Sequence, residues 1–226
     1  MHSRTGQAVS GEELSAAVSR AFGQATAVLG RDFLVTSALR GTSWHRARRQ
    51  PTSPVRRRLR HELGQLVAGL HRIHGPTFGY PQPETGLHGT RRAEVITPTL
   101  VHFDLWEGNF VLDTGAAGPR IEGLIDAERA FGGDPHADFV SLALFDDIEK
   151  DAALVAGYRV AGGQVDFTPR LCRRLTLYQA YLYLIMIVEA VPRGYAGPRH
   201  LVTQRFCRHK LKDAPRNLAL ATEADR

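Results

Sequence analysis

The stretch VHFDLWEGNF, residues 101–110, decides the fold of this 226-residue chain. Apolar residues at both ends of it predict short strands, at 100–103 and 110–112, with a tight loop between them. Asp104 and Asn109 both fall in that loop. A loop of this kind can present a carboxylate and a neutral amide to one cleft, so the two side chains are candidates for joint chemistry.

The spacing of Asp104 and Asn109 is that of the catalytic loop in kinases. The transition state of phosphoryl transfer carries spread negative charge and needs little covalent help. One carboxylate must orient the attacking hydroxyl and accept its proton, and one amide must hold Mg²⁺ without adding negative charge. The spacing alone is a weak signal, because it arises by chance and Asp104 could equally cap a turn.

Two later segments extend the pattern. An apolar strand predicted at 121–125 ends in Asp126, and turn residues at 113–119 precede it. The resulting hairpin can bring Asn109 and Asp126 to the same metal ion. The third segment is GGDPHADF, residues 132–139. Three such segments in this order are a much stronger signal than the first one alone.

The patterns HxDxxxxN (102–109), IDxE (125–128) and GDPxxD (133–138) together resemble the aminoglycoside phosphotransferase family, which also includes choline, homoserine and fructosamine kinases. The resemblance implies ATP and Mg²⁺ as cofactors and transfer of the ATP γ-phosphate to a hydroxyl of a small molecule. It covers roughly residues 33–191. HRIHGPTFGYP, residues 71–81, is similar to a stretch common in bacterial members.

The resemblance also implies a role for individual residues. Asp104 matches the catalytic base, and Asn109 and Asp126 match the magnesium ligands. Asp138 matches an acid that braces the catalytic loop from the helix below. The segment FLVTSALRG, residues 33–41, resembles the hinge strand, whose backbone hydrogen-bonds adenine. The implied cofactor-binding residues of that strand are Phe33, Val35, Ser37 and Leu39.

Three departures from the family pattern stand out. Position 103 is Phe where the family usually has Gly, and position 127 is Ala where it often has Trp. A kinase of this type also needs an N-terminal lysine that holds the α- and β-phosphates. The first lysine in the sequence is Lys150, beyond the predicted metal ligands. We therefore expect most of the N-terminal lobe to be missing, with weak ATP·Mg binding as the consequence.

The expected fold class is α+β, a protein-kinase-like fold made mainly of the helical C-terminal lobe with a residual β-hairpin. Residues 1–40 would be the remnant of the N-terminal lobe and the hinge strand, and residues 41–226 the helical catalytic lobe. Apolar residues at helical spacing predict a helix over 55–74, which Gly75 and Pro76 end. A weaker helical pattern covers 12–22, and the hairpin is predicted at 25–39.

Composition limits the protein class. The chain is 43% hydrophobic and 23% charged, as in ordinary globular proteins. It contains no apolar run of the ~18–20 residues that cross a bilayer, and its first residues lack the apolar core of a secretory signal. We expect a cytoplasmic protein with no membrane partner. Its two cysteines are too few for a disulfide scaffold.

The net charge of +6 reflects either a compositional bias toward arginine or an anionic partner, which could be a nucleotide or a nucleic acid. Arginines at 46–49 and 56–60 are not interleaved with aromatic residues, so a solvated helix face is preferred and no nucleic-acid partner is expected. His71 and His74 share a helix face but have no third metal ligand. A further set of acids could line a pocket for a cationic substrate or merely cap turns: Glu128, Asp134, Asp146, Asp147 and Glu149.

Three functional hypotheses follow. The preferred one is a small-molecule phosphotransferase whose partners are a nucleotide and a hydroxyl acceptor, with weak self-association through the exposed hairpin. The alternative is a truncated or pseudokinase-like module that binds a ligand without turnover. A basic nucleic-acid-binding domain is the third, and salt-dependent binding to DNA or RNA would distinguish it.

Overall fold

The computed structural model describes residues 38–47, 51–75, 77–80, 97–116 and 118–223. By its internal contacts the chain divides into two units, residues 1–39 and 40–226. The predicted helix at 12–22 and most of the predicted hairpin at 25–39, with Phe33, Val35 and Ser37, lie outside the described residues. Leu39 is described; it is exposed and belongs to no helix or strand. The rest of the description concerns the second unit.

Helix α3 (Ser53–Leu70) confirms the first predicted helix of this unit. It starts at a Pro-containing first turn, as the fixed φ of proline favours. It ends earlier than predicted because the backbone carbonyl of Ile73 accepts a hydrogen bond from Leu100 N at 2.8 Å. That pairing draws the chain after Leu70 toward a strand, and Ile73 is left 54% exposed.

Two small antiparallel sheets follow. In the first, the strands lie in the order β1 (Thr42–Ser43), β3 (Phe110–Asp113) and β4 (Arg120–Leu124). The antiparallel pairing of β3 with β4 confirms the hairpin predicted around the turn at residues 113–119. In the second, β2 (Thr99–Val101) pairs with β5 (Phe131–Gly133). The sequence pattern predicted β2 but neither β1 nor β5.

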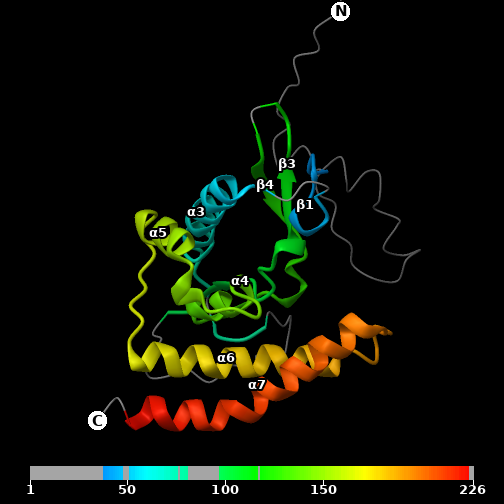
Figure 1. Cartoon of the computed structure of the whole chain (residues 1–226). Coiled ribbons are helices and arrows are strands. Elements are labelled where there is room, and N and C mark those ends of the chain that lie inside the picture. The colour runs from blue at the N-terminus through cyan, green and yellow to red at the C-terminus, as the bar shows by residue number, and fades with distance from the viewer. Residues whose placement is uncertain (1–37, 48–50, 76, 81–96, 117, 224–226) are drawn as a thin grey trace, which may run out of the picture. The chain divides into compact units, whose positions relative to one another are not determined.

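The remaining helices are α4 (Phe139–Leu142), α5 (Ala152–Val160), α6 (Pro169–Val188) and α7 (Pro198–Glu223). Helix α5 packs against α3, and α7 packs along α6 (Figure 1). Short 3₁₀ turns connect the elements: η1 (Trp44–Arg46), η2 (Glu107–Asn109), η3 (Ala127–Arg129), η4 (Pro135–Asp138) and η5 (Ile148–Lys150). Among the described helices, none is long and apolar enough to cross a membrane.

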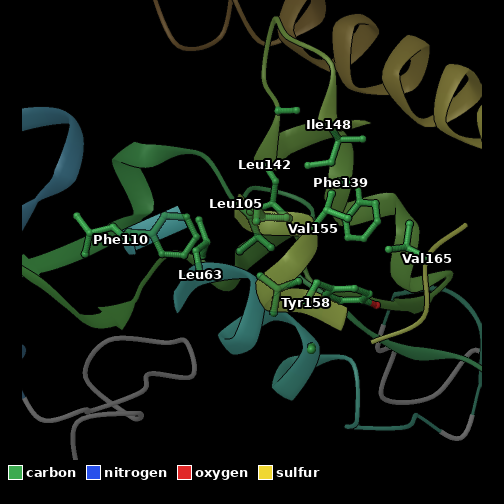
Figure 2. Packing of buried hydrophobic residues seen from close by; sticks show 14 of the residues in the cluster. Leu63, Leu105, Phe110, Phe139, Leu142, Ile148, Val155, Tyr158 and Val165 are labelled. Carbon is green, nitrogen blue, oxygen red and sulfur yellow. The ribbon is translucent and has the colours of Figure 1, made fainter. Parts of the chain in front are cut away.

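Two clusters of buried apolar side chains enclose the loop after β2. The larger cluster joins α3, β3, α4 and α5 and includes Leu105 and Phe110 (Figure 2). The smaller cluster contains Val101, Phe103 and Leu182 of α6. Phe103 and Leu105 are both fully buried, each in a different cluster, so the loop backbone is anchored on both sides of Asp104.

The arginines of α3 differ from the expected solvated face at one position. Arg56, Arg57 and Arg58 are exposed, as predicted, but Arg60 is buried. Its guanidinium donates to Asp151 Oδ2 at 2.6 Å and to the carbonyl of Leu142 at 2.9 Å. Arg60 therefore links α3 to the last residue of α4 and to the residue before α5. As a whole, this mixture of helices and small antiparallel sheets is compatible with the expected kinase-like fold.

Candidate active site

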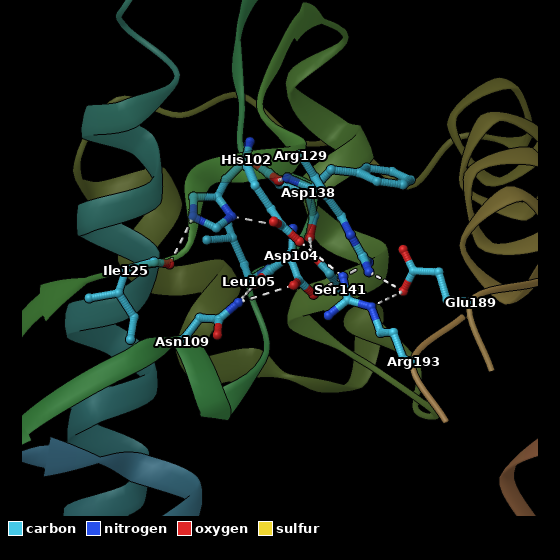
Figure 3. A network of polar contacts seen from close by, with 12 residues as sticks. His102, Asp104, Leu105, Asn109, Ile125, Arg129, Asp138, Ser141, Glu189 and Arg193 are labelled. Carbon is cyan, nitrogen blue, oxygen red and sulfur yellow. Dashed lines mark hydrogen bonds and ion pairs between the residues drawn. The ribbon is translucent and has the colours of Figure 1, made fainter. Parts of the chain in front are cut away.

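Asp138 holds the backbone at the start of the loop. It is fully buried, directly before α4, and its Oδ1 accepts a hydrogen bond from Phe103 N at 2.6 Å. Its Oδ2 accepts from His102 N at 3.1 Å and lies 3.0 Å from His71 Nε2. These contacts confirm the predicted brace (Figure 3).

His71 is a structural partner of that brace. Its Nδ1 lies 2.9 Å from the hydroxyl of Tyr158, so both ring nitrogens are engaged. A neutral imidazole satisfies both contacts by donating to Asp138 and accepting from Tyr158. Burial, together with the nearby charges of Asp138 and Asp134, raises the pKa of Tyr158. His71 therefore has no nitrogen left for a metal ion.

Phe103 stands at the position where the aminoglycoside phosphotransferase family usually has glycine. Its φ of 61° lies in the left-handed region, which glycine adopts without cost and a bulky residue does not. The ring is held in the smaller apolar cluster, with its centroid 5.6 Å from the ring centroids of both Phe131 and Tyr181. Packing of a large aromatic ring thus offsets a backbone conformation that usually requires glycine.

Ser141 of α4 makes a second brace, which the sequence analysis did not identify. Its Oγ accepts a hydrogen bond from Leu105 N at 2.9 Å and donates to the carbonyl of Asp138 at 3.1 Å. The hydroxyl is buried with these partners. Asp138 and Ser141, three positions apart, therefore fix the backbone on both sides of Asp104.

Asp104 is half-buried and hydrogen-bonded to Asn109, so the loop brings these two side chains together. Asn109 Nδ2 donates to the Asp104 carbonyl at 2.9 Å and to Asp104 Oδ2 at 3.1 Å. Burial raises the pKa of Asp104, and the charge of Asp126 adds to this effect. The charges of Arg129 and His102 and the Asn109 hydrogen bond oppose it, but the net direction is upward. A carboxylate of raised pKa is a stronger base than an ordinary aspartate.

Asp126 lies close enough to Asp104 for the two charges to interact. Ile125 N donates to the Asn109 carbonyl at 3.0 Å, which extends the pairing of β3 with β4 and holds Asp126 beside Asn109. The Ile125 carbonyl contacts His102 Nε2 at 3.2 Å. Asp126 itself is exposed, and its backbone is in the left-handed region with a φ of 67°.

The donor set suits Mg²⁺, which prefers oxygen ligands and takes one or two from protein with the rest from phosphate and water. Within the described residues, Asn109 uses Nδ2 for its hydrogen bonds, so Oδ1 accepts none from the protein. In the same part of the chain, no group of three or more His, Cys, Asp or Glu side chains is placed to hold a metal. A carboxylate and an amide that share an ion with phosphate require no such group.

Arg129 was missed by the sequence analysis. Its Nη1 lies 3.9 Å from Asp104 Oδ1, and its Nη2 donates to Glu189 Oε2 at 2.5 Å. Arg193 contacts the same Glu189 oxygen at 3.3 Å (Figure 3). Arg193 also binds Glu128 at 3.0 Å. An ion-pair chain therefore links the Asp104 carboxylate to the end of α6.

The other acidic residues do not form one pocket. Asp134 is buried and accepts hydrogen bonds from His136 N, Arg174 Nε and the Tyr178 hydroxyl. Burial alone would raise the pKa of Asp134, but the hydrogen bonds and charge of His136, with the charge of Arg174, lower it to about 2. Asp134 is thus a turn cap, the second of the two roles considered for it.

Three further acids of the set follow α4, and one of them, Glu149, donates its backbone N–H to Asp147 Oδ1 at 3.0 Å. Asp146 and Asp147 line an open cavity of about 950 Å³ together with Trp106 and Glu107 of the loop, but Asp104 is not among its lining residues. Asp147 also pairs with Lys150, whose side chain is 77% exposed. The first lysine of the sequence therefore belongs to this cavity and makes no ion pair with Asp104 in the described structure.

The phosphotransferase enzyme family model matches residues 87–175 of the chain. Among curated proteins, a protein named "Probable ketoamine kinase" from Lactiplantibacillus plantarum is 36% identical over 105 residues. That alignment covers 46% of this chain and 32% of the relative, so the chain spans about a third of the relative's length. No solved structure gives a significant match. Over the matched residues, the chain is therefore similar to phosphotransferases of this family and to a small-molecule kinase.

Proposed function

We propose that this chain is the catalytic part of a phosphotransferase that moves the γ-phosphate of ATP to a hydroxyl of a small molecule. The observation that carries the proposal is the braced loop, in which Asp104 and Asn109 share a hydrogen bond beside Asp126. The family match over residues 87–175 contains all three. Nothing in this arrangement needs a covalent intermediate.

In this proposal Asp104 acts as the general base. It orients the acceptor hydroxyl and takes its proton as the new bond forms between the acceptor oxygen and the γ-phosphorus. The bond between that phosphorus and the β,γ-bridging oxygen breaks, and ADP leaves. Asn109 and Asp126 would hold Mg²⁺, which supplies positive charge at the phosphates. Asp138 and Ser141 keep the loop in position for this step.

The acceptor class is proposed from the relative. That protein is named a ketoamine kinase, and a ketoamine or amino sugar offers the hydroxyl that the proposed reaction needs. The adenine contacts of the hinge strand at Phe33, Val35, Ser37 and Leu39, and a cytoplasmic location, stay predictions of the same proposal.

A second candidate is a ligand-binding module without turnover. The position of Lys150 favours it, because that lysine pairs with Asp147 in a separate cavity. A lysine on the α- and β-phosphates is part of the kinase machinery.

Calorimetry with ATP and magnesium, combined with a transfer assay on ketoamines, amino sugars and aminoglycosides, tests the proposal. We expect Asp104→Asn to bind ATP·Mg as the parent does but to lose transfer by ~10²–10⁴-fold, the usual contribution of a general base. Transfer that survives in Asp104→Asn would refute the assigned base. ATP binding without transfer to any acceptor would favour the second candidate.

A further inference from the structure

The surroundings of Asp104 carry a surplus of negative charge. Asp126 follows Ile125, whose backbone N–H donates to the Asn109 carbonyl, and Glu128 and Glu189 belong to the ion-pair chain that reaches Asp104. A triphosphate brings further negative charge to the same place, so transfer there requires fixed positive charge. In the described part of the chain, the one arginine or lysine that pairs with Asp104 is Arg129.

The guanidinium of Arg129 is fixed in position by its neighbours before any ligand binds. Its side chain is 16% exposed, and Glu189 fixes one end of the guanidinium. Glu189 is itself held by Arg193, so it does not depend on Arg129 alone. The 3.9 Å separation from Asp104 exceeds hydrogen-bond length, and Nη1 donates no hydrogen bond within the described residues. One end of the guanidinium is therefore fixed while the other remains available to a ligand oxygen.

We propose that Arg129 is a further catalytic residue, which binds the phosphoryl group while it passes to the acceptor. The inference rests on the proposed function, because it assigns a role within the same site. The acceptor hydroxyl must lie against Asp104 to lose its proton, and the γ-phosphorus must lie against that hydroxyl. A guanidinium beside Asp104 is then within reach of the phosphoryl oxygens.

The energetic reason for this role of Arg129 lies in the charge of the phosphoryl group during transfer. Negative charge on the three equatorial oxygens is the feature that a cation can stabilise, and an arginine supplied within the same chain is one known solution. Its planar fork suits two phosphoryl oxygens better than a lysine would. Arg129 therefore affects transfer more than it affects binding of ADP.

A transition-state mimic tests this separation directly. Calorimetry of the 226-residue chain with ADP and Mg²⁺ is compared with the same titration after addition of aluminium fluoride, whose planar complex imitates the moving phosphoryl group. We expect aluminium fluoride to tighten ADP binding at least ~10-fold in the parent chain. Arg129→Gln is expected to lose about 10- to 100-fold of affinity for the mimic, as one charge-assisted contact would, with ADP·Mg binding unchanged.

Arg193→Gln is the matched control, because Arg193 binds the same Glu189 oxygen but is not paired with Asp104. It should change mimic binding by less than about threefold, the range of an exposed ion pair. Arg129→Lys should recover part of the lost affinity. Thermal denaturation of each variant establishes that it is folded. In the transfer assay, Arg129→Gln should lower kcat and leave KM for ATP near the parent value.

The outcomes separate the two claims. If the parent and Arg129→Gln bind the mimic equally, Arg129 does not contact the phosphoryl group and this inference fails, while the proposed function stands. If Arg129→Gln weakens ADP·Mg and the mimic by the same factor, the role is general binding and the inference also fails. If the parent chain binds neither ADP·Mg nor the mimic, the proposed function fails and the inference fails with it.

Discussion

Asp138 and Asp104 lie on either side of the same turn of backbone, yet the structure surrounds them differently. Asp138 is fully buried and its two oxygens contact two backbone amides and a histidine. Asp104 is half-buried, its Oδ2 accepts a hydrogen bond from the side-chain amide of Asn109, and its Oδ1 lies 3.9 Å from Arg129 Nη1. Both oxygens of Asp138 are hydrogen-bonded inside the protein, whereas Asp104 accepts a side-chain hydrogen bond at one oxygen only.

The difference separates stability from function. A buried carboxylate whose partners are all in place becomes costly to remove, because each partner would be left unpaired in the interior. A carboxylate whose pKa is raised by burial is, in its ionised form, less stable in the folded protein than in water. We therefore expect changes at Asp138 to act on folding and changes at Asp104 to act on chemistry.

The largest expected effect is that of Asp138→Ala. The substitution leaves two backbone amides and His71 without their acceptor, and it should lower the free energy of unfolding by about 3 kcal/mol or more. Urea denaturation of the variant and the parent measures the loss. Asp104→Asn is the control: since burial raises the pKa of Asp104, a neutral amide there should leave stability unchanged or increase it. Equal stability of Asp138→Ala and the parent would mean that Asp138 does not brace the loop.

A second expected effect separates Asp134 from Asp104, because their pKa values move in opposite directions. The pKa of Asp134 is lowered from 3.8 to about 2, so its ionised form contributes about 2 kcal/mol of stability above pH ~4. That contribution should be lost as the pH falls from 4 through about 2. Urea denaturation at several pH values compares the parent with Asp134→Asn. The two stability curves should converge toward pH 2; curves that stay parallel would mean that Asp134 is not held in its ionised form.

The smallest effect concerns the second brace. Ser141→Ala leaves Leu105 N without an acceptor and should cost about 1 kcal/mol, with faster hydrogen exchange at the Leu105 amide. Ser43→Ala provides a matched comparison, because the Ser43 hydroxyl donates to the Gly108 carbonyl at 2.9 Å in a part-buried place that water can reach. It should cost less than Ser141→Ala. The reverse order would mean that the loop is held mainly from the β1 side.

Elements with a regular local pattern were predictable from sequence. Leu59, Leu63 and Val67 recur at helical spacing and form the buried face of α3. The apolar residues of β3 and β4, separated by turn residues, predicted the hairpin that holds Asn109. The brace at Asp138 followed from the family pattern, and its contacts are present.

Features that depend on residues distant in sequence were not predictable. Arg129 and Glu189 are 60 positions apart, and neither lies in a motif that would associate them. Strand β5 (Phe131–Gly133) ends in two glycines, which locally indicate a turn, and it becomes a strand by pairing with β2. The buried position of Arg60 likewise depends on Asp151 of a distant turn. These contacts arise when elements pack, and single-sequence periodicity does not encode them.

Phe103 has a consequence for protein engineering. Its left-handed backbone is tolerable because Phe131 and Tyr181 enclose its ring, and Tyr181 lies on α6, far along the chain. Moved to another scaffold without those neighbours, the loop would relax to a different backbone shape and turn Asp104 away from Asn109. A successful graft would have to carry the aromatic enclosure as well, or replace Phe103 with the glycine that needs none.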